Sequence, residues 1–451
     1  MTKKRGMMRY SGTRRVHLGE RSLATSGRQL KALGLVGLVS LTALSGALRL
    51  ARSAESTTRA RAGAVAATAP APRVSLPMKA APIMEVDPAT VGLSPGRLDD
   101  AVAAVRREIR RGAFPGAALA IGRGSDIALL KGIGGVTWSG PDVSPDSTVY
   151  DLASLTKVVA TTTAVMLLVE DGKMSLDAPV QLYLPEFSGG AKSLVTVRML
   201  LTHTSGLPAG VGVDGLTPAQ ALMKIYRTPL INQPGEAVVY SDLSMIVLFE
   251  AAQRAAGETV PRLLQRRVFG PLGMTSTFYT PGEGNCPRCA PTLILNDGRP
   301  FRGGVNDPTA RQLGGVTGNA GLFSTAADLS RFAAMLASGG ELNGVRILKP
   351  ETIRLFTQRQ PGAKNRALGW ETPDPKGVGA AGLRISPDAF GHTGYTGTSL
   401  WVDPDRHTWT VLLTNRTFDP RASNQIQSLR RQVHDDVALA AVDRYRPKLA
   451  Q

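Results

Sequence analysis

An apolar segment, residues 154–170, places the strongest constraint on how this chain can fold. It has the sequence SLTKVVATTTAVMLLVE and is followed by Asp171-Gly172, a pair typical of a helix end. A helix of this sequence is apolar almost all round, and a helix of that kind has to be buried. We therefore expect a helix in the middle of the protein, with the rest of the chain packed around it.

Two polar residues stand at the start of this expected helix. Ser154 and Lys157 are three positions apart, so their side chains share one face. A hydroxyl is a poor nucleophile at neutral pH, and a buried amine with a lowered pKa is one group that can activate it. The free N–H groups of a helix start also suit an anionic intermediate. The spacing alone is also consistent with a serine cap followed by a solvated lysine.

The positive charge of the chain is concentrated at its N-terminal end. The 451 residues carry a formal charge of +18, and the first 73 hold 14 Lys and Arg against two Glu, which leaves +6 for the remaining 378. The mildly basic remainder has no aromatic residues interleaved with basic ones and no zinc-knuckle spacing. We therefore expect no nucleic-acid binding.

The same end has the order of an export signal. Basic residues from Lys3 to Lys31 precede the apolar run 32–48, and small residues follow at 51–56. The run is short for a membrane span and contains three glycines. We predict that residues 1–56 are a cleaved signal peptide or an uncleaved inner-membrane anchor through 32–48. Either would place the body outside the cytoplasm, in the periplasm or secreted.

A linker and a large folded body follow. Residues 57–86 are rich in Ala, Pro and Arg without apolar periodicity, which predicts an extended linker. The body is expected over 87–446, and a chain with 43% hydrophobic residues can bury a sizeable core. Cys286 and Cys289 are its only cysteines. They are too few for a four-cysteine zinc site, so a local disulfide or an incidental pair is expected.

The pattern of the body places strands toward its two ends and helices between them. The middle, from 154 to about 275, is mostly helical by its apolar spacing. The other expected elements are helices at 93–116, 325–340 and 422–445 and strands at 117–123, 126–135, 366–372, 398–404 and 408–415. This order predicts an α+β fold, in which both chain ends build one sheet and the helical part is inserted between them.

Two later segments give the Ser154 segment its partners. Tyr240-Ser241-Asp242 lies at a transition from extended chain to helix, and His392-Thr393-Gly394 lies at a strand edge. With Ser-x-x-Lys, in this order, they resemble the serine β-lactamase and penicillin-binding protein superfamily, in particular its class C β-lactamase-like branch of carboxypeptidases, esterases and D-amino-acid peptidases. Supporting stretches are LLTHTSGLP (200–208), NAGLFSTAADLSRF (319–332), LGW (368–370) and HTGYTGTSLWVDP (392–404).

The resemblance covers about residues 87–445 and implies a β-lactamase/transpeptidase-like fold with an antiparallel sheet. It implies that Ser154 is the acylated nucleophile, that Lys157 activates it, and that Tyr240 is the base. The oxyanion hole would be formed by the backbone N–H groups of Ser154 and Tyr395. Asp242, His392, Thr393 and Gly394 would line the substrate site.

Two departures from the family pattern affect recognition of the substrate. Asp242 stands where the family often has Asn, and its carboxylate should favour a charged Lys157. His392 stands where β-lactamases have Lys, and it would be cationic only at lower pH. If His392 must be charged, activity should show a pH limb near neutrality. Both departures argue against efficient antibiotic hydrolysis. His203, close to Ser205, is interpreted as part of a packing turn.

We predict an exported serine hydrolase that forms an acyl-enzyme on Ser154. The favoured substrate is a cell-wall peptide ending in D-alanine, as for a D-Ala-D-Ala carboxypeptidase. A small-ester esterase or weak β-lactamase is the alternative within the family, and a catalytically silent peptidoglycan-binding scaffold is the alternative of another class. The resemblance implies no metal and no organic cofactor. We expect a monomer whose partners are small-molecule or peptide substrates, including peptidoglycan fragments.

Overall fold

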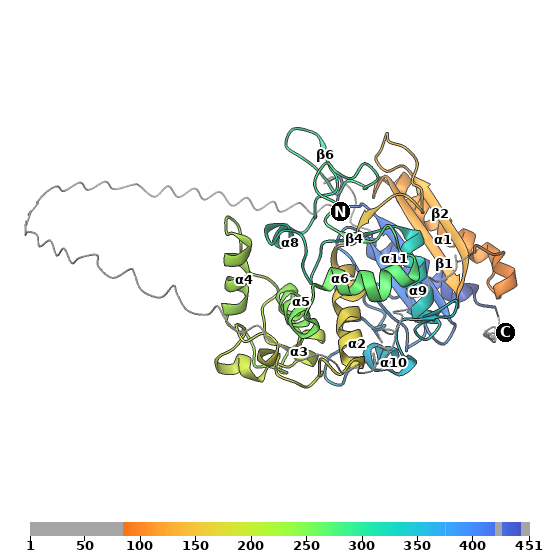
Figure 1. Cartoon of the computed structure of the whole chain (residues 1–451). Coiled ribbons are helices and arrows are strands. Elements are labelled where there is room, and N and C mark those ends of the chain that lie inside the picture. The colour runs from red at the N-terminus through yellow and green to blue at the C-terminus, as the bar shows by residue number, and fades with distance from the viewer. Residues whose placement is uncertain (1–83, 375, 420–425, 443–451) are drawn as a thin grey trace, which may run out of the picture. The chain divides into compact units, whose positions relative to one another are not determined.

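The computed structural model describes residues 84–374, 376–419 and 426–442 (Figure 1). The predicted export signal, 1–56, and all but the last three residues of the predicted linker lie outside the described residues. Those two assignments therefore stay predictions. The remaining elements can be compared with the sequence one by one.

The centre of the fold is a five-stranded antiparallel sheet with the order β10-β11-β12-β1-β2. The first and last parts of the chain meet in the middle of it, where Ala118 of β1 pairs with Leu413 of β12. The strands are β1 (Gly116–Arg123), β2 (Asp126–Gly134), β10 (Phe390–Thr393), β11 (Ser399–Asp403) and β12 (Thr408–Thr414). The prediction of one antiparallel sheet built from both chain ends is confirmed.

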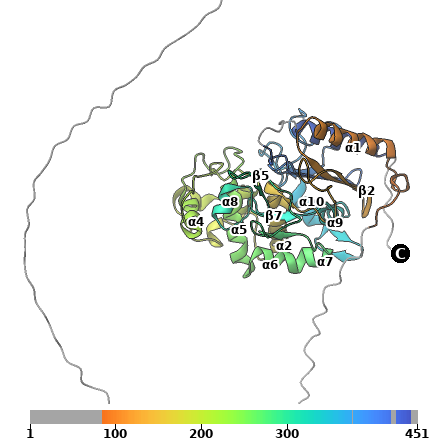
Figure 2. The same ribbon diagram turned by 90° about the horizontal axis from the view of Figure 1, so that it is seen from above.

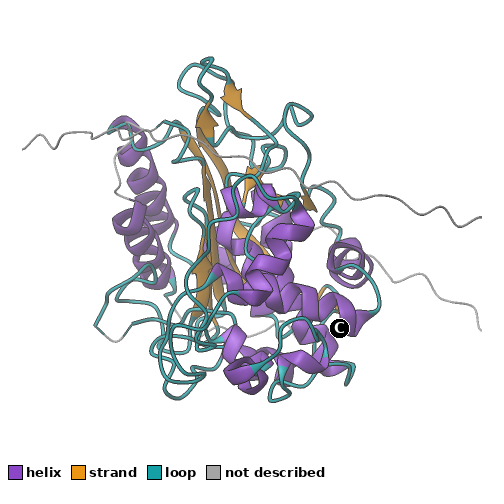
Figure 3. Ribbon diagram, turned by 90° about the vertical axis from the view of Figure 1, so that its left-hand side faces the viewer, coloured by secondary structure: helices purple, strands orange, loops and turns teal. Residues whose placement is uncertain are grey.

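Helices cover both faces of this sheet, which Figure 3 shows edge-on between them. Successive side chains of a strand point to opposite faces, so Leu119 and Ile121 pack with α1 (Pro95–Arg110) and α11 (Ile426–Ala440). Ala118 and Ala120 face the larger core that includes α9 (Ala326–Ala337). Because both faces are covered, β1 and β12 are buried along their whole length.

The inserted part is mostly helical, as predicted, and Figure 2 shows its helices α4 and α5 on the side of the molecule away from the sheet. Several of its helices begin at side-chain caps; for example, the Thr217 hydroxyl accepts from the Gln220 N–H at the start of α4. The helices are α3 (Val197–Leu201), α4 (Pro218–Arg227), α5 (Asp242–Ala256), α6 (Val260–Leu264), α7 (Gly270–Leu272), α8 (Pro308–Gln312) and α10 (Pro350–Thr357). α3 ends at Leu201, just before the His203-Thr204-Ser205-Gly206 turn.

The apolar segment 154–170 is a buried helix of mixed geometry. A 3₁₀ turn, Ala153–Leu155, is followed by a π-helical stretch, Lys157–Thr162, and by α2, Thr163–Glu170. The span is long and apolar enough to cross a membrane, but 83% of it is buried inside the protein. The predicted burial is confirmed. The wide π turn, which sequence patterns do not reveal, is common at functional sites.

Short strands connect the start of this helix to the region of loops and short elements at 278–324. β3 (Tyr150–Asp151) leads into the Ser154 turn and pairs with β7 (Leu322–Ser324), which also pairs with β4 (Phe278–Tyr279). Two further hairpins are β5 (Leu293–Ile294) with β6 (Pro300–Phe301) and β8 (Glu341–Leu342) with β9 (Val345–Arg346). Cys286 and Cys289 form a disulfide, one of the two possibilities left open by the sequence.

The strand predicted over 366–372 is wrong. Gly369 has φ +84°, a value that L side chains rarely adopt, and the chain turns there. The turn brings Arg366 and Glu371 opposite each other in an isolated bridge. The apolar residues of this segment, Leu368 and Trp370, are buried in the core although they do not belong to a strand.

Candidate active site

Ser154 is presented on a sharp turn directly after β3. The preceding residue, Ala153, has φ +47°, which is unfavourable for a residue with a Cβ. The carboxylate of Asp151 holds this turn by accepting from the Ala153 N–H at 2.8 Å and from the Asn306 N–H at 2.7 Å. Burial raises the pKa of Asp151 to about 6. Ser154 itself is partly exposed, so a substrate can reach its hydroxyl.

Lys157 is completely buried and contacts Ser154 directly. Its ammonium group donates to Ser154 Oγ at 3.0 Å and to the Asn319 carbonyl at 3.0 Å. It also forms an ion pair with Asp242 Oδ1 at 2.7 Å. Burial lowers the pKa of Lys157, but the charge of Asp242 and the nearby Tyr240 outweigh that effect and raise it above its usual range.

The geometry therefore corrects one idea from the sequence. The spacing of Ser154 and Lys157 predicts an amine with a lowered pKa, whereas the pKa of Lys157 is raised and the side chain is an ammonium at neutral pH. The expectation that Asp242 favours a charged Lys157 is confirmed. Lys157 can orient Ser154 and stabilise negative charge, while the proton of Ser154 needs another acceptor.

Tyr240 lies beside Lys157 and is the candidate for that acceptor. It precedes α5, and its neighbours are fixed because the Val239 N–H donates to the His203 carbonyl and the Ser241 N–H donates to His203 Nδ1. The centre of its ring lies 5.0 Å from Lys157 Nζ. The ring of His203 packs against it at 4.7 Å between centroids. The interpretation of His203 as a packing residue agrees with this geometry.

The His392 strand edge is fastened to the segment that carries Ser154. After β10, the hydroxyl of Thr396 donates to the Asp151 carbonyl at 2.8 Å, and that of Thr398 donates to the Leu152 carbonyl at 3.0 Å. Gly394 lies so close that a Cβ there would come within 2.4 Å of the Leu152 carbonyl oxygen. The turn that contains Tyr395 is thus held beside the nucleophile segment.

His392 is buried and uncharged at neutral pH. Its Nδ1–H donates to the Thr393 carbonyl at 2.8 Å, and its Nε2 has no hydrogen-bond partner among the described residues. Burial lowers the pKa of His392 to about 4; Glu371 opposes this shift and Arg366 adds to it. Any pH limb that arises from His392 is therefore expected near pH 4, not near neutrality.

Sequence reasoning missed the pair Arg366 and Glu371. Their side chains form an ion pair at 3.1 Å, and the Arg366 guanidinium lies 5.1 Å from the centre of the Tyr240 ring. The two residues flank the LGW stretch (368–370), which could have indicated a role in the site. A strand over 366–372 would have kept Arg366 and Glu371 apart, whereas the turn at Gly369 brings them together. Arg366 thus adds a second cation, after Lys157, beside Tyr240, the candidate base.

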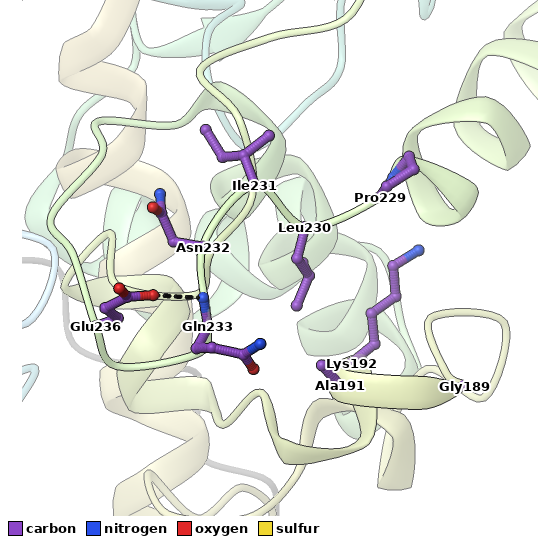
Figure 4. Close-up of a pocket in the computed structure, with 9 residues that line it drawn as sticks. All are labelled: Gly189, Ala191, Lys192, Pro229, Leu230, Ile231, Asn232, Gln233 and Glu236. Carbon is purple, nitrogen blue, oxygen red and sulfur yellow. Dashed lines mark hydrogen bonds between the residues drawn. The ribbon is translucent and has the colours of Figure 1, made fainter.

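A pocket of about 430 Å³ lies apart from these groups (Figure 4). Figure 4 shows that it is bordered by 229–236, a segment that leads toward Tyr240, and by Lys192. Lys192 donates to the Tyr226 carbonyl at 2.5 Å. None of the predicted site residues lines this pocket, so we locate the site by the contacts of Ser154. Among the described residues, no cluster of three His, Cys, Asp or Glu side chains could hold a metal ion.

A partly exposed serine in contact with a buried lysine, with a tyrosine and a strand edge beside them, defines a serine hydrolase of the serine β-lactamase and penicillin-binding protein superfamily. The comparison with known families agrees: the model of the family "Beta-lactamase" matches residues 99–434. The chain belongs to this family and has its β-lactamase/transpeptidase-like fold.

Relatives and solved structures support the same placement. A "Putative D-alanyl-D-alanine carboxypeptidase" of Escherichia coli K12 is 30% identical over 66% of this chain and 76% of its own length. The solved structure of EstCE1, "a hydrolase with promiscuous acyltransferase activity", has a TM-score of 0.63 at 23% identity, over 76% of this chain and 99% of that one. A penicillin-binding protein homologue from Caulobacter crescentus has a TM-score of 0.61 at 22% identity, over 77% and 99%. These two structures show the shared fold.

Proposed function

We propose that the protein is an exported D-Ala-D-Ala carboxypeptidase that cleaves cell-wall-derived peptides through an acyl-enzyme on Ser154. The contact of Ser154 Oγ with Lys157 Nζ at 3.0 Å, beside Tyr240, carries the proposal. The name of the relative in Escherichia coli supports the substrate class. The apolar run 32–48 supports export. Recovery of the protein from the cell envelope would test export, and the intact mass of that protein would show whether the N-terminal segment has been removed.

The geometry suggests how the bond is cleaved. Tyr240, as the phenolate, takes the proton of Ser154 as Oγ attacks the substrate carbonyl. The N–H groups of Ser154 and Tyr395 stabilise the oxyanion, and the charge of Lys157 stays near the reacting oxygen. The proton then passes to the leaving amine, and a water molecule activated by Tyr240 hydrolyses the acyl-enzyme.

A second candidate is hydrolysis of small neutral esters. The neutral His392 favours it, because a D-Ala-D-Ala peptide carries a carboxylate and β-lactamases have a cationic lysine at this position. An ester without a carboxylate would not need that charge. The two candidates share the acylation chemistry and differ only in recognition.

One experiment separates these candidates. The purified protein and its Ser154→Ala variant are incubated with a D-Ala-D-Ala peptide, a p-nitrophenyl ester and a fluorescent penicillin. Turnover of each compound is measured, and the mass of the intact protein shows whether a covalent adduct has formed. We expect release of D-alanine and an adduct only in the protein that retains Ser154. Ester turnover without peptide cleavage would instead support the esterase. Absence of any adduct or turnover would leave the silent scaffold as the explanation.

A further inference from the structure

The carbonyl groups of the turn between β10 and β11 accept hydrogen bonds from residues that follow the turn in the chain. The turn closes on itself, because the Gly394 N–H donates to the Thr398 carbonyl at 2.8 Å and the Gly397 N–H donates to the Gly394 carbonyl at 3.0 Å. The Tyr395 carbonyl accepts from Arg416 Nε at 2.8 Å. The turn is therefore anchored through its oxygen atoms by groups that follow it in the chain.

The strongest of these anchors is Arg430 of α11. Only 2% of its surface is exposed, and one guanidinium nitrogen donates to the carbonyls of Gly394 and Thr398, each at 2.7 Å. Burial lowers the pKa of Arg430 to about 9, so it is still a cation at neutral pH. Among the described residues it forms no ion pair with a carboxylate. Within the described part of the chain, the hydrogen bonds of Arg430 go only to carbonyl oxygens, and burial of a cation in this way is costly for stability, which calls for a functional explanation.

The planarity of the peptide bond gives that explanation. The Gly394 carbonyl and the Tyr395 N–H belong to one peptide unit, and the described chain contains no cis peptide bond. In a trans peptide the C=O and the N–H point in opposite directions. By holding the carbonyl toward α11, Arg430 directs the Tyr395 N–H to the opposite side of the turn. The same turn is hydrogen-bonded to the segment that enters Ser154, through the hydroxyls of Thr396 and Thr398.

We infer that Arg430 is a positioning residue that orients and polarises the Tyr395 N–H as a donor of the oxyanion hole. A charge-assisted hydrogen bond to the carbonyl draws electron density from the peptide unit and makes its N–H a stronger donor. This inference rests on the proposed acyl-enzyme function. It assigns to the C-terminal helix a part in catalysis although that helix does not touch the substrate.

The test compares Arg430→Met and Arg430→Lys with Arg123→Met in the full-length protein. Arg123 is a matched control: it is a buried arginine, 1% exposed, that likewise donates to backbone carbonyls, those of Val91 and Gly92 at 2.9 Å each and that of Arg406 at 3.0 Å. Three quantities are measured: kcat and KM for a p-nitrophenyl ester, the Kd of an aryl boronic acid, and the unfolding midpoint in urea. The serine oxygen adds to the boron atom, and a boron-bound oxygen of the tetrahedral adduct then occupies the oxyanion hole.

Arg430→Met is expected to lower kcat and weaken boronate binding, each by about 10- to 100-fold, because loss of one oxyanion donor costs about 100- to 1,000-fold and this donor is only misdirected. KM should change little. Arg430→Lys, which keeps a charge near the carbonyls, should recover part of both losses. Arg123→Met should lower the unfolding midpoint while its kcat and boronate Kd stay at the wild-type values.

The inference is wrong if Arg430→Met loses stability as Arg123→Met does and keeps wild-type kcat and boronate affinity. Turnover that depends on Ser154 would still support the proposed function in that case. If the wild-type protein has no such turnover and forms no boronate adduct, the proposed function itself fails. If Arg430→Met does not fold, the uncharged variant Arg430→Gln decides: wild-type kcat and boronate affinity in that variant would overturn the inference.

Discussion

The ion pair between Lys157 and Asp242 determines which group can accept the proton of Ser154. A buried lysine without a partner would lose its proton readily, because burial disfavours the charged form. The carboxylate 2.7 Å away reverses this and keeps the ammonium. The side chain of Asp242 is 33% exposed, so the pair lies at the border between core and substrate site.

Replacing Asp242 by Asn should therefore change the pH dependence of catalysis. The pKa of Lys157 should fall, since burial would no longer be opposed by a carboxylate. If the ammonium is needed, the basic limb of kcat/KM moves to lower pH in Asp242→Asn. Initial rates of ester hydrolysis between pH 6 and 10 would measure this shift. Identical basic limbs in the two proteins would show that the ion pair does not control the active protonation state.

The sequence identified the polar residues that approach Ser154 directly, but not those that hold them. Lys157, Tyr240 and Asp242 belong to short motifs whose chemistry can be inferred from residue type and spacing. Arg366 contacts the Tyr240 ring and Arg430 contacts the Gly394 carbonyl, and both partners lie far away in the chain. A signal for Arg430 existed, because it falls on the apolar face of α11 between Ile426 and Val433. The apolar spacing predicts that Arg430 is buried, but it does not identify the carbonyl groups to which Arg430 donates.

At the scale of elements, the site depends on a close contact between a strand edge and a helix start. Strands rich in apolar and β-branched residues, such as β1 and β12, were predictable because burial on both faces favours such sequences. The π turn after Ser154 and the turn at Gly369 were not. Both depend on backbone geometry that is imposed by packing and not by local preference.

Gly394→Ala should separate this contact from general stability. A Cβ at this position would come within 2.1 Å of Thr398 Oγ1 and 2.4 Å of the Leu152 carbonyl oxygen, so the turn has to move away from the Ser154 segment. We expect kcat/KM for the ester to fall by at least about tenfold and the unfolding free energy to fall by about 1–3 kcal/mol.

The control for this prediction is Gly96→Ala in α1. Nothing lies within 4 Å of a Cβ there, and the residue is helical. This change should leave kcat/KM unaltered and stabilise the protein by up to about 1 kcal/mol. Unfolding in urea and ester kinetics measure both variants. Full activity in Gly394→Ala would show that the close contact is not needed for catalysis.

At the scale of the whole molecule, buried histidines should make the fold sensitive to acid. Burial lowers the pKa of His392 and His434 to about 4, below the usual value of a histidine. The unfolded chain therefore binds protons first as the pH falls, and stability is lost between about pH 6.5 and 4. Asp151 and Asp436 act in the opposite direction, because burial raises their pKa to about 6.

His434 allows a test outside the active site. Its Nδ1–H donates to the Ala380 carbonyl at 2.7 Å, and its ring lies against Trp401. In His434→Gln, the loss of unfolding free energy between pH 6.5 and 4 should be smaller by about 3 kcal/mol, which corresponds to the removed pKa difference. Urea titrations at several pH values measure it. Parallel curves for the two proteins would mean that His434 is not held uncharged by burial.

The pairing of β1 with β12 also governs when the protein can fold. Ala118 and Leu413 are neighbours in the centre of the sheet, although almost the whole body separates them in the chain. A ribosome therefore has to release nearly all of the polypeptide before the central sheet can close. Contacts between such distant segments form slowly, because a long loop must be ordered first. The growing chain is thus expected to stay without its native sheet until synthesis is almost finished.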